Sequence, residues 1–246
     1  AGSCTRLTVA GSSFLVEARR LLDLAAEAQL SVRRVAAGES GTVHIGFTSV
    51  VGNMVLPHLL PIAAQELPDI EIVLHELRTA EQGESLLTSK IDIALGRPYA
   101  LGTELHARPL PPDGLVLALP RATVSDRDGT PRTLRELDGM DVVMYAATGP
   151  RHVPDVVTSV LVAHDVHPRV VPRVVEVYTM LRFVDSVMGA AIVPASTRGW
   201  GGDHTVFVEL PELADAELHS IASWRPGSSS PAMGSILTLL QNAAER

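Results

Sequence analysis

The feature that most constrains the fold of this chain is an alternation of strand-like and helix-like segments from Val43 onward. Short apolar runs, typical of buried strands, are separated by longer segments with helical spacing of their apolar residues. The predicted strands lie at 43–48, 70–76, 91–95, 142–145, 170–175 and 190–194. Such an alternation predicts parallel sheets with crossover helices, and its repetition predicts two α/β subdomains that face each other.

Composition narrows the class of protein. The chain has 246 residues, 46% of them hydrophobic, which leaves room for one large or two small domains. Its formal net charge of −8 argues against gripping nucleic acid by itself, because phosphate neutralisation requires clustered Lys and Arg. Cys4 is the only cysteine, so an intrachain disulfide or a cysteine-rich metal site is excluded, and a reducing cytoplasm fits.

The ends of the chain and its apolar runs add two expectations. No apolar run is long enough to span a membrane, so we expect no membrane partner. The N-terminus lacks the positively charged region and apolar core of a secretory signal. Because the chain begins without Met and opens directly into patterned sequence, we expect a fragment of a longer protein.

Residues 13–36 have the composition of a helix with one apolar stripe. The stripe recurs at alternating spacings of four and three, and consists of Phe14, Ala18, Leu21, Ala25, Ala28, Val32 and Val35. Two interpretations stay open at this point, because the helix could pack on its own domain or pair with another helix. The Ala-rich stripe favours close helix pairing.

Four segments together resemble the LysR-type transcriptional regulators, and most closely the benzoate and muconate regulators of aromatic catabolism. They are VHIGFTSVVGNMVLPHLLPIAAQELPDIEIVLHELRTAEQ, TRLTVAGSSFLVEARRLL, IDIALGRP and VVEVYTMLRFVDSVMGAAIVPAS. The resemblance implies a periplasmic-binding-protein type II-like fold: two Rossmann-like subdomains joined by two crossing strands and preceded by a long linker helix that mediates dimerisation. It covers nearly the whole chain, and no single motif in it is diagnostic.

The same resemblance implies a domain division. Residues 1–37 would hold the end of a winged helix-turn-helix and the linker helix, 42–116 with 217–246 would form subdomain I, and 117–216 would form subdomain II. We place the hinge in the segments 115–119 and 218–224.

The implied function is that of an effector-sensing domain, which binds a small, aromatic or unsaturated carboxylate in the cleft between the subdomains to control transcription. Its implied partners are this effector, a second copy or three further copies of the chain, RNA polymerase, and promoter DNA through the missing N-terminal winged helix-turn-helix. The alternative is a periplasmic or extracellular solute-binding protein of the same fold. The stripe on residues 13–36 discriminates the two, because a solute receptor needs no coiled-coil helix ahead of its first strand.

An enzyme is not expected, because the chain has no nucleophile elbow, phosphate loop or zinc-protease motif. We predict neither a cofactor nor a metal. His164 and His167 lie three residues apart at the end of a predicted helix, but no cysteine or obvious third ligand is near them.

Hydroxyl side chains stand where predicted strands end and helices begin, and in an open α/β sheet ligands bind outside the carboxyl ends of the strands. Thr48 and Ser49 end the first strand beside free helix N–H groups, so they suit either helix capping or an anionic ligand. Thr79 with Gln82 matches a capping box, whereas the resemblance implies that Thr79 contacts the effector. Arg97 could reach a ligand carboxylate or hold its own loop in a salt bridge.

The loop 145–153 matches the place where subdomain II closes over the ligand, with Thr148, Arg151 and His152 as polar candidates. Its alternative interpretation is a solvated loop whose Gly-Pro sets the turn. The chain departs from the muconate-responsive pattern at Val50, where we align a serine, and at Val153, where an aromatic residue stands. We place Val50 and Val153 in the pocket, and muconate itself does not follow from the resemblance.

Overall fold

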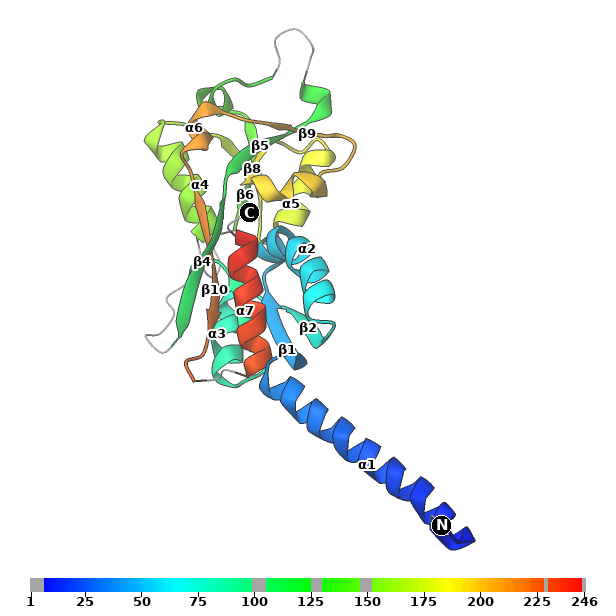
Figure 1. The fold of residues 1–246 in the computed structure, drawn as a ribbon. Helices are drawn as coiled ribbons and strands as arrows, with labels where there is room; N and C mark the ends of the chain where they lie inside the picture. Colours follow the sequence, from blue (N-terminus) through cyan, green and yellow to red (C-terminus); the bar gives the residue numbers. More distant parts are fainter. Residues whose placement is uncertain (1–6, 99–104, 125–129, 147–151, 228–229, 245–246) are drawn as a thin grey trace.

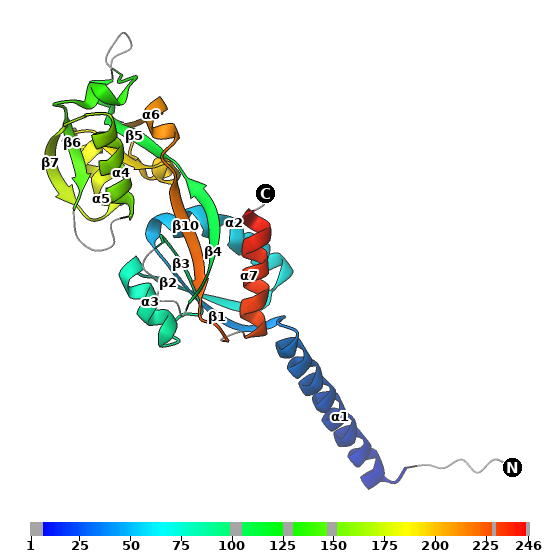
Figure 2. The same ribbon diagram turned by 90° about the vertical axis from the view of Figure 1, so that its left-hand side faces the viewer.

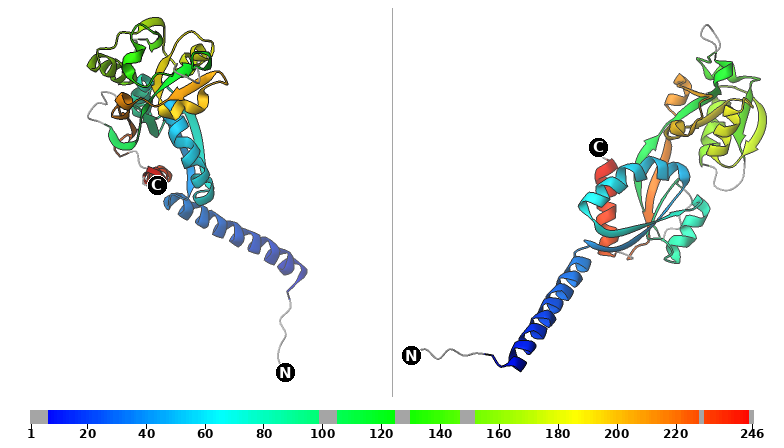
Figure 3. Two further views of the ribbon diagram at one scale, coloured as in Figure 1. Left: turned by 90° about the horizontal axis from the view of Figure 1, so that it is seen from above. Right: turned by 90° about the vertical axis from the view of Figure 1, so that its right-hand side faces the viewer.

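The computed structural model describes residues 7–98, 105–124, 130–146, 152–227 and 230–244. Its first element is the helix α1 (Val9–Ala36), whose N-cap residue Thr8 accepts a hydrogen bond from the Gly11 amide at 3.0 Å. The helix extends away from the rest of the molecule in every view (Figure 1, Figure 2 and Figure 3). Its apolar side chains are exposed, Phe14 at 74% and Val32 at 69%, so the helix does not bury its stripe against its own domain.

The first half of the α/β region is a five-stranded sheet in the order β2-β1-β3-β10-β4. Its strands are β1 (Ser40–Phe47), β2 (Asp69–Glu76), β3 (Ile93–Gly96), β4 (His106–Asp113) and β10 (Leu218–Trp224). Strand β1 runs parallel to β2 and β3, whereas β10 runs antiparallel to β3 and β4. Strand β4 is at the edge, which fits the prolines at 109, 111 and 112 because proline cannot donate to a central ladder.

Helices cover both faces of this sheet. The helices α2 (Ser49–Glu66) and α7 (Pro231–Ala244) lie on one face and α3 (Thr79–Leu87) on the other (Figure 2). Leu59 of α2 and Ile236 of α7 are buried in one apolar cluster with Val43 and Ile45 of β1. The Ser230 hydroxyl accepts a hydrogen bond from the Met233 amide at 3.1 Å at the start of α7, as a serine before a helix-starting proline predicts.

The second half repeats this arrangement. It contains β5 (Leu115–Pro120), β6 (Asp141–Tyr145), β7 (Arg169–Val174), β8 (Ala191–Pro194) and β9 (Thr205–Val208), with the helices α4 (His152–Ala163), α5 (Val177–Asp185) and α6 (Pro211–Ala214). Short 3-10 helices lie at Arg121–Thr123, Leu134–Leu137 and Ala195–Trp200. The sheet β8-β5-β9 and the pair β6-β7 are linked by a bridge between Val142 and Ala190, so the order is β7-β6-β8-β5-β9.

Two strand connections join the halves. The chain leaves the first sheet after Asp113 in β4 and enters the second at Leu115 in β5, and it returns between α6 and Leu218 in β10. The segments predicted as the hinge, 115–119 and 218–224, lie within single sheets, because β5 pairs with β8 and β9 and β10 pairs with β3 and β4. The chain crosses between the halves just before each of these segments. Within the described ranges, no helix combines the length and the apolar character needed to cross a membrane.

Candidate functional site

A cavity of about 730 Å³ lies where the carboxyl ends of the strands in both halves meet. The first half contributes the starts of α2 and α3, and the second contributes the end of β6 and the starts of α4 and α5. Seven residues that the sequence placed in a ligand site line this cavity together: Thr48, Ser49, Val50, Thr79, Arg97, His152 and Val153. Thr148 and Arg151 fall outside the described residues.

Thr48 is the N-cap residue of α2, with φ −85° and ψ 146°. Its amide donates to the Leu95 carbonyl of β3 at 3.1 Å, and its own carbonyl accepts from Gly52 at 2.8 Å. Its side chain makes no capping hydrogen bond, so the hydroxyl is not used by the helix. The first amides of an α-helix have no partner within the helix and carry a partial positive charge, which favours an anion at this end of the cavity.

The predicted capping box at Thr79 is wrong. The N-cap residue of α3 is Arg78, and its amide donates to Glu81 Oε2 at 3.0 Å. Gln82 does not reach back: its buried side chain donates to the Leu95 carbonyl at 3.2 Å. The N-cap lies one residue earlier than predicted, and Gln82 ties α3 to β3 instead of capping the helix. Thr79 is thus the first residue of the helix, and it lines the cavity.

Arg97 is buried, and much of its hydrogen-bonding capacity is used by the protein itself. Nη1 donates to the Leu218 carbonyl at 2.8 Å, the His219 carbonyl at 3.3 Å and Ser220 Oγ at 3.0 Å, and Nη2 lies 3.4 Å from Asp113 Oδ2. Burial lowers the pKa of Arg97, and the charge of Asp113 opposes that shift. Arg97 therefore holds the junction between β4 and β10 while one side of it lines the cavity.

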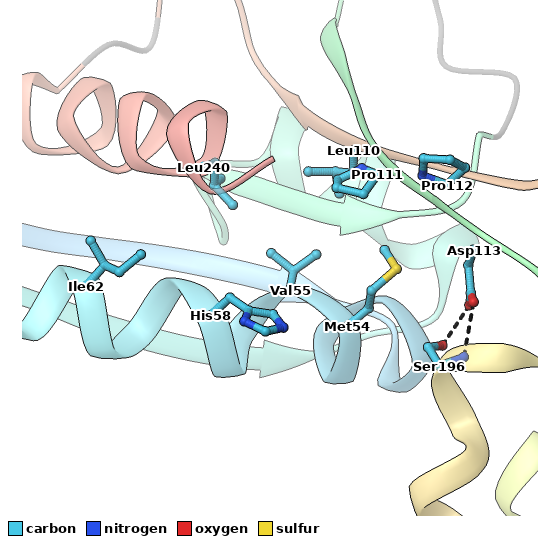
Figure 4. Close-up of a pocket in the computed structure, with 10 residues that line it drawn as sticks. All are labelled: Met54, Val55, His58, Ile62, Leu110, Pro111, Pro112, Asp113, Ser196 and Leu240. Atoms are coloured by element: carbon cyan, nitrogen blue, oxygen red, sulfur yellow. Dashed lines mark hydrogen bonds between the residues drawn. The ribbon is translucent and has the colours of Figure 1, made fainter. Parts of the chain in front are cut away.

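Asp113 extends this network into the second half. Its carboxylate accepts from the Ser196 amide at 3.1 Å and from Ser196 Oγ at 2.6 Å (Figure 4). The carbonyl of Ser196 in turn accepts from Asn53 Nδ2 of α2 at 3.1 Å. A second cavity, of about 550 Å³, lies beside this contact and is walled mainly by apolar side chains of α2, β4 and α7, among them Met54 and Leu240.

Tyr145 is a lining residue that the sequence did not single out. It ends β6 with only 8% of its surface exposed, and its hydroxyl has no hydrogen-bond partner among the described residues. Burial raises the pKa of Tyr145, so the side chain is a neutral phenol. The available signal was its position at the carboxyl end of an apolar strand, but a sequence does not show that a hydroxyl is buried.

His152 also lines the cavity, at the start of α4. Its Nε2 atom is buried and has no partner in the described part of the chain, and its ring centroid lies 6.5 Å from that of His219. Burial lowers the pKa of His152, the charges of Arg97 and His219 lower it further, and Asp155 opposes the shift. The imidazole is therefore held in its neutral form.

Each of the two histidines considered for a metal site contacts another polar group of the protein. His164 Nδ1 lies 2.9 Å from the Val160 carbonyl, and His167 Nε2 lies 3.1 Å from Asp165 Oδ1. Over the residues that the structure describes, no three His, Cys, Asp or Glu side chains are grouped as a metal site requires.

Comparison with known proteins agrees with this geometry. Residues 36–245 match the family "LysR substrate binding domain". The chain is 30% identical over 225 residues to the probable cat1 operon transcriptional activator of Acinetobacter lwoffii, covering 92% of this chain and 74% of that protein. It is 31% identical over 242 residues to the regulator CatR of Pseudomonas putida, covering 98% and 81%.

Solved structures share the fold. The LysR-family regulator CbnR superimposes with a TM-score of 0.85 at 22% identity, over 96% of this chain and 81% of that one. The effector-binding domain of BenM with its effector benzoate superimposes with a TM-score of 0.68 at 23% identity, over 82% and 90%. The family match excludes the alternative of a solute-binding protein and the enzyme class. The chain therefore belongs to the LysR family of transcriptional regulators, and its α/β region is the effector-binding domain.

Proposed function

We propose that the cavity between the two halves binds a small aromatic or unsaturated carboxylate, and that its occupancy controls transcription. The observation that carries this proposal is the convergence of three hydroxyl residues and two helix N-termini on one cavity. Thr48 and Ser49 stand at the start of α2 and Thr79 at the start of α3. Hydroxyls and free helix amides donate hydrogen bonds to an anion, and the helix dipoles favour its charge.

Charged residues around the cavity are compatible with an acid. Arg97 adds a cation to the lining, although Asp113 balances part of its charge. The glutamates in the lining, Glu76, Glu81 and Glu176, are exposed, so water screens their repulsion. We expect the ligand carboxylate near the hydroxyl residues and away from these side chains.

The apolar residues of the cavity lining suit the carbon skeleton of the ligand. Val50, Leu77, Val153, Val175 and Val177 contribute apolar surface, and small-ligand pockets commonly combine such walls with a few polar groups. The likeness to a BenM domain that holds benzoate supports an aromatic acid. Val50 and Val153 replace polar and aromatic residues of the muconate-responsive pattern, so we expect a ligand other than muconate.

The wider assembly is part of the proposal. We assign residues 1–37 to the linker region, 42–116 with 217–246 to subdomain I, and 117–216 to subdomain II. The exposed stripe of α1 would pair with a second copy in a homodimer or homotetramer. Promoter DNA would be bound through a winged helix-turn-helix ahead of α1, RNA polymerase would be contacted at the promoter, and the protein would act in the cytoplasm, as expected of a transcriptional regulator.

Thermal unfolding with benzoate and with neutral benzamide tests the ligand class. A ligand at 100 times its Kd adds about 2.7 kcal/mol to the free energy of unfolding, so benzoate should raise Tm and benzamide should not. Thr79→Val should weaken benzoate binding roughly ten- to hundredfold, because a hydrogen bond to a charged group is lost.

The matched control is Thr88→Val. The Thr88 hydroxyl donates to the Glu84 carbonyl at the other end of α3, outside the cavity lining, and its removal should leave the affinity unchanged. Equal stabilisation by benzoate and benzamide would contradict the carboxylate proposal. Unchanged affinity in Thr79→Val would contradict the placement of the ligand.

A further inference from the structure

Two histidines on neighbouring strands of the first sheet contact each other away from the cavity. His44 stands in β1 and His75 in β2, and the parallel register places Gly46, two residues after His44, beside His75. Nδ1 of His44 lies 3.0 Å from Nε2 of His75, and the ring centroids are 5.3 Å apart. Both side chains are partly buried. The two residues come together only through strand pairing, so the sequence did not indicate this pair.

The separation of these two nitrogens suits a single metal ion. Imidazole nitrogens bind zinc at about 2.0–2.1 Å, so two of them on one ion lie roughly 2.8–3.4 Å apart, depending on the angle between the two bonds. Imidazole is a preferred ligand of Zn²⁺, Cu²⁺ and Ni²⁺, whereas Mg²⁺ and Ca²⁺ prefer oxygen. The paired strands fix the spacing of the two rings, and sites built on strands are held more precisely than sites on loops.

A shared ion requires that neither of the facing nitrogens carries a hydrogen. A neutral imidazole holds its hydrogen on either nitrogen, so the hydrogen between the rings can move to an outer one, His44 Nε2 or His75 Nδ1. Neither outer nitrogen is among the described buried atoms that lack a hydrogen-bond partner, so this change strands no polar group. The carboxylate of Asp92, which accepts from the His44 amide at 2.8 Å, adds negative charge near the pair and favours a cation.

We propose that His44 and His75 together bind one transition-metal dication of the class of Ni²⁺, Cu²⁺ and Zn²⁺. Two protein ligands leave the other coordination positions to water, so this is an open site on the face of the sheet and not a closed centre of three or four side chains. Because β2 is the edge strand, the ion would tie the edge of the sheet to β1. The proposal does not depend on what the cavity binds, since neither histidine lines it.

Calorimetric titration with NiCl₂ tests the pair, in a Cys4→Ser chain so that the one thiol of the sequence does not compete. The parent should bind Ni²⁺, and the ion should raise Tm because it binds the folded pair. His75→Gln should lower the affinity at least about tenfold, since loss of a group that merely supports a metal ligand already costs about 10- to 100-fold. Mg²⁺ should bind neither protein at this site.

His164→Gln is the matched control, because it also removes one histidine, and His164 is exposed in the second half. It should bind Ni²⁺ as the parent does. His44→Gln repeats the test from the other ring, and denaturant midpoints without metal verify that each variant is folded. Failure of the parent to bind Ni²⁺ would overturn the proposal, as would equal affinity in the parent and His75→Gln. An equal loss in His164→Gln would also overturn it, because the ion would then bind scattered surface histidines.

Discussion

The two halves of the domain share a strand order but present different chemistry to the cavity. In the first half, β2-β1-β3-β10-β4 places hydroxyl residues at the N-termini of α2 and α3. In the second half, β7-β6-β8-β5-β9 places a buried phenol and a neutral imidazole at the corresponding edge. The repeated topology therefore fixes where the cavity lies, and the side chains at the strand ends give each of its walls a different chemistry.

The largest expected difference between the halves concerns their ion pairs. In the first half, Arg97 and Asp113 pair with side chains only 8% and 4% exposed, whereas Arg169 and Asp141 pair on the surface of the second half with 69% and 35% exposed. Arg97→Met should lower the free energy of unfolding by about 3–5 kcal/mol, because it leaves a buried carboxylate without its cation.

Arg169→Met is the matched control, and it should cost only about 0–1 kcal/mol because solvent screens an exposed pair. Urea denaturation of both variants measures the two values. Similar losses in both would show that the buried pair does not hold the junction, and the contrast between the two halves would then be lost.

A smaller effect is expected at the ends of the second helices of the two halves. Ser89 after α3 and Val187 after α5 occupy the same left-handed position, with φ 59° and 61°, and each donates its amide three residues back. This conformation suits glycine, and it strains a β-branched residue more than a serine. Val187→Gly should raise the free energy of unfolding by about 1 kcal/mol, and Ser89→Gly by about half of that.

Thermal unfolding of the parent and of the two variants measures both changes in the free energy of unfolding. Val187 is 55% exposed, so its removal sacrifices little packing. A loss of stability in Val187→Gly would mean that the valine side chain contributes more through its contacts than its backbone strain costs.

The smallest expected effect is a pH dependence of folding stability that arises from one histidine of the second half. Because the pKa of His152 is lowered in the folded protein, the unfolded chain takes up a proton first as the pH falls below the ordinary histidine range. The ligand-free domain should therefore lose stability between about pH 7 and the lowered pKa, and His152→Gln should remove that part of the loss.

Urea denaturation at several pH values measures this slope. The free energy of unfolding of each protein should be compared with its own value at pH 8, where histidine is neutral in the folded and unfolded states. The pH-independent effect of the substitution on stability then cancels. An identical slope in both proteins would contradict a lowered pKa of the half-buried His152.

The sequence predicted most of the fold because the information was local. Alternating apolar runs located the strands, and Ser230 with Pro231 marked the start of α7 as found. Local patterns failed where one residue of register decided the outcome, as at Thr79, which is the first residue of α3 and not its N-cap. The points where the chain crosses between the sheets were not located for a related reason, because an apolar strand carries no mark of which sheet it joins.

The lining of the cavity was predicted in part for the same reason. Hydroxyls at strand ends can be found by position, so Thr48, Ser49 and Thr79 were named in advance. The partners of Arg97 could not be, since Asp113 lies 16 residues away and Leu218 lies 121 away. Tyr145 was not singled out, because the burial of its side chain in the cavity lining is a property of the packed structure.

The projecting helix α1 has a geometric consequence for signalling. Its 28 residues, at about 1.5 Å of rise per residue, make a rod of roughly 42 Å. The base of the rod is fixed to the first half, where Arg34 pairs with Asp69 and the Ser235 hydroxyl donates to the Gly38 carbonyl at 3.0 Å. A tilt of about 10° at this base moves the far end by roughly 7 Å, which is about two base-pair steps along DNA. A small rotation of the first half would thus displace the far end of α1 by a distance comparable to two base-pair steps.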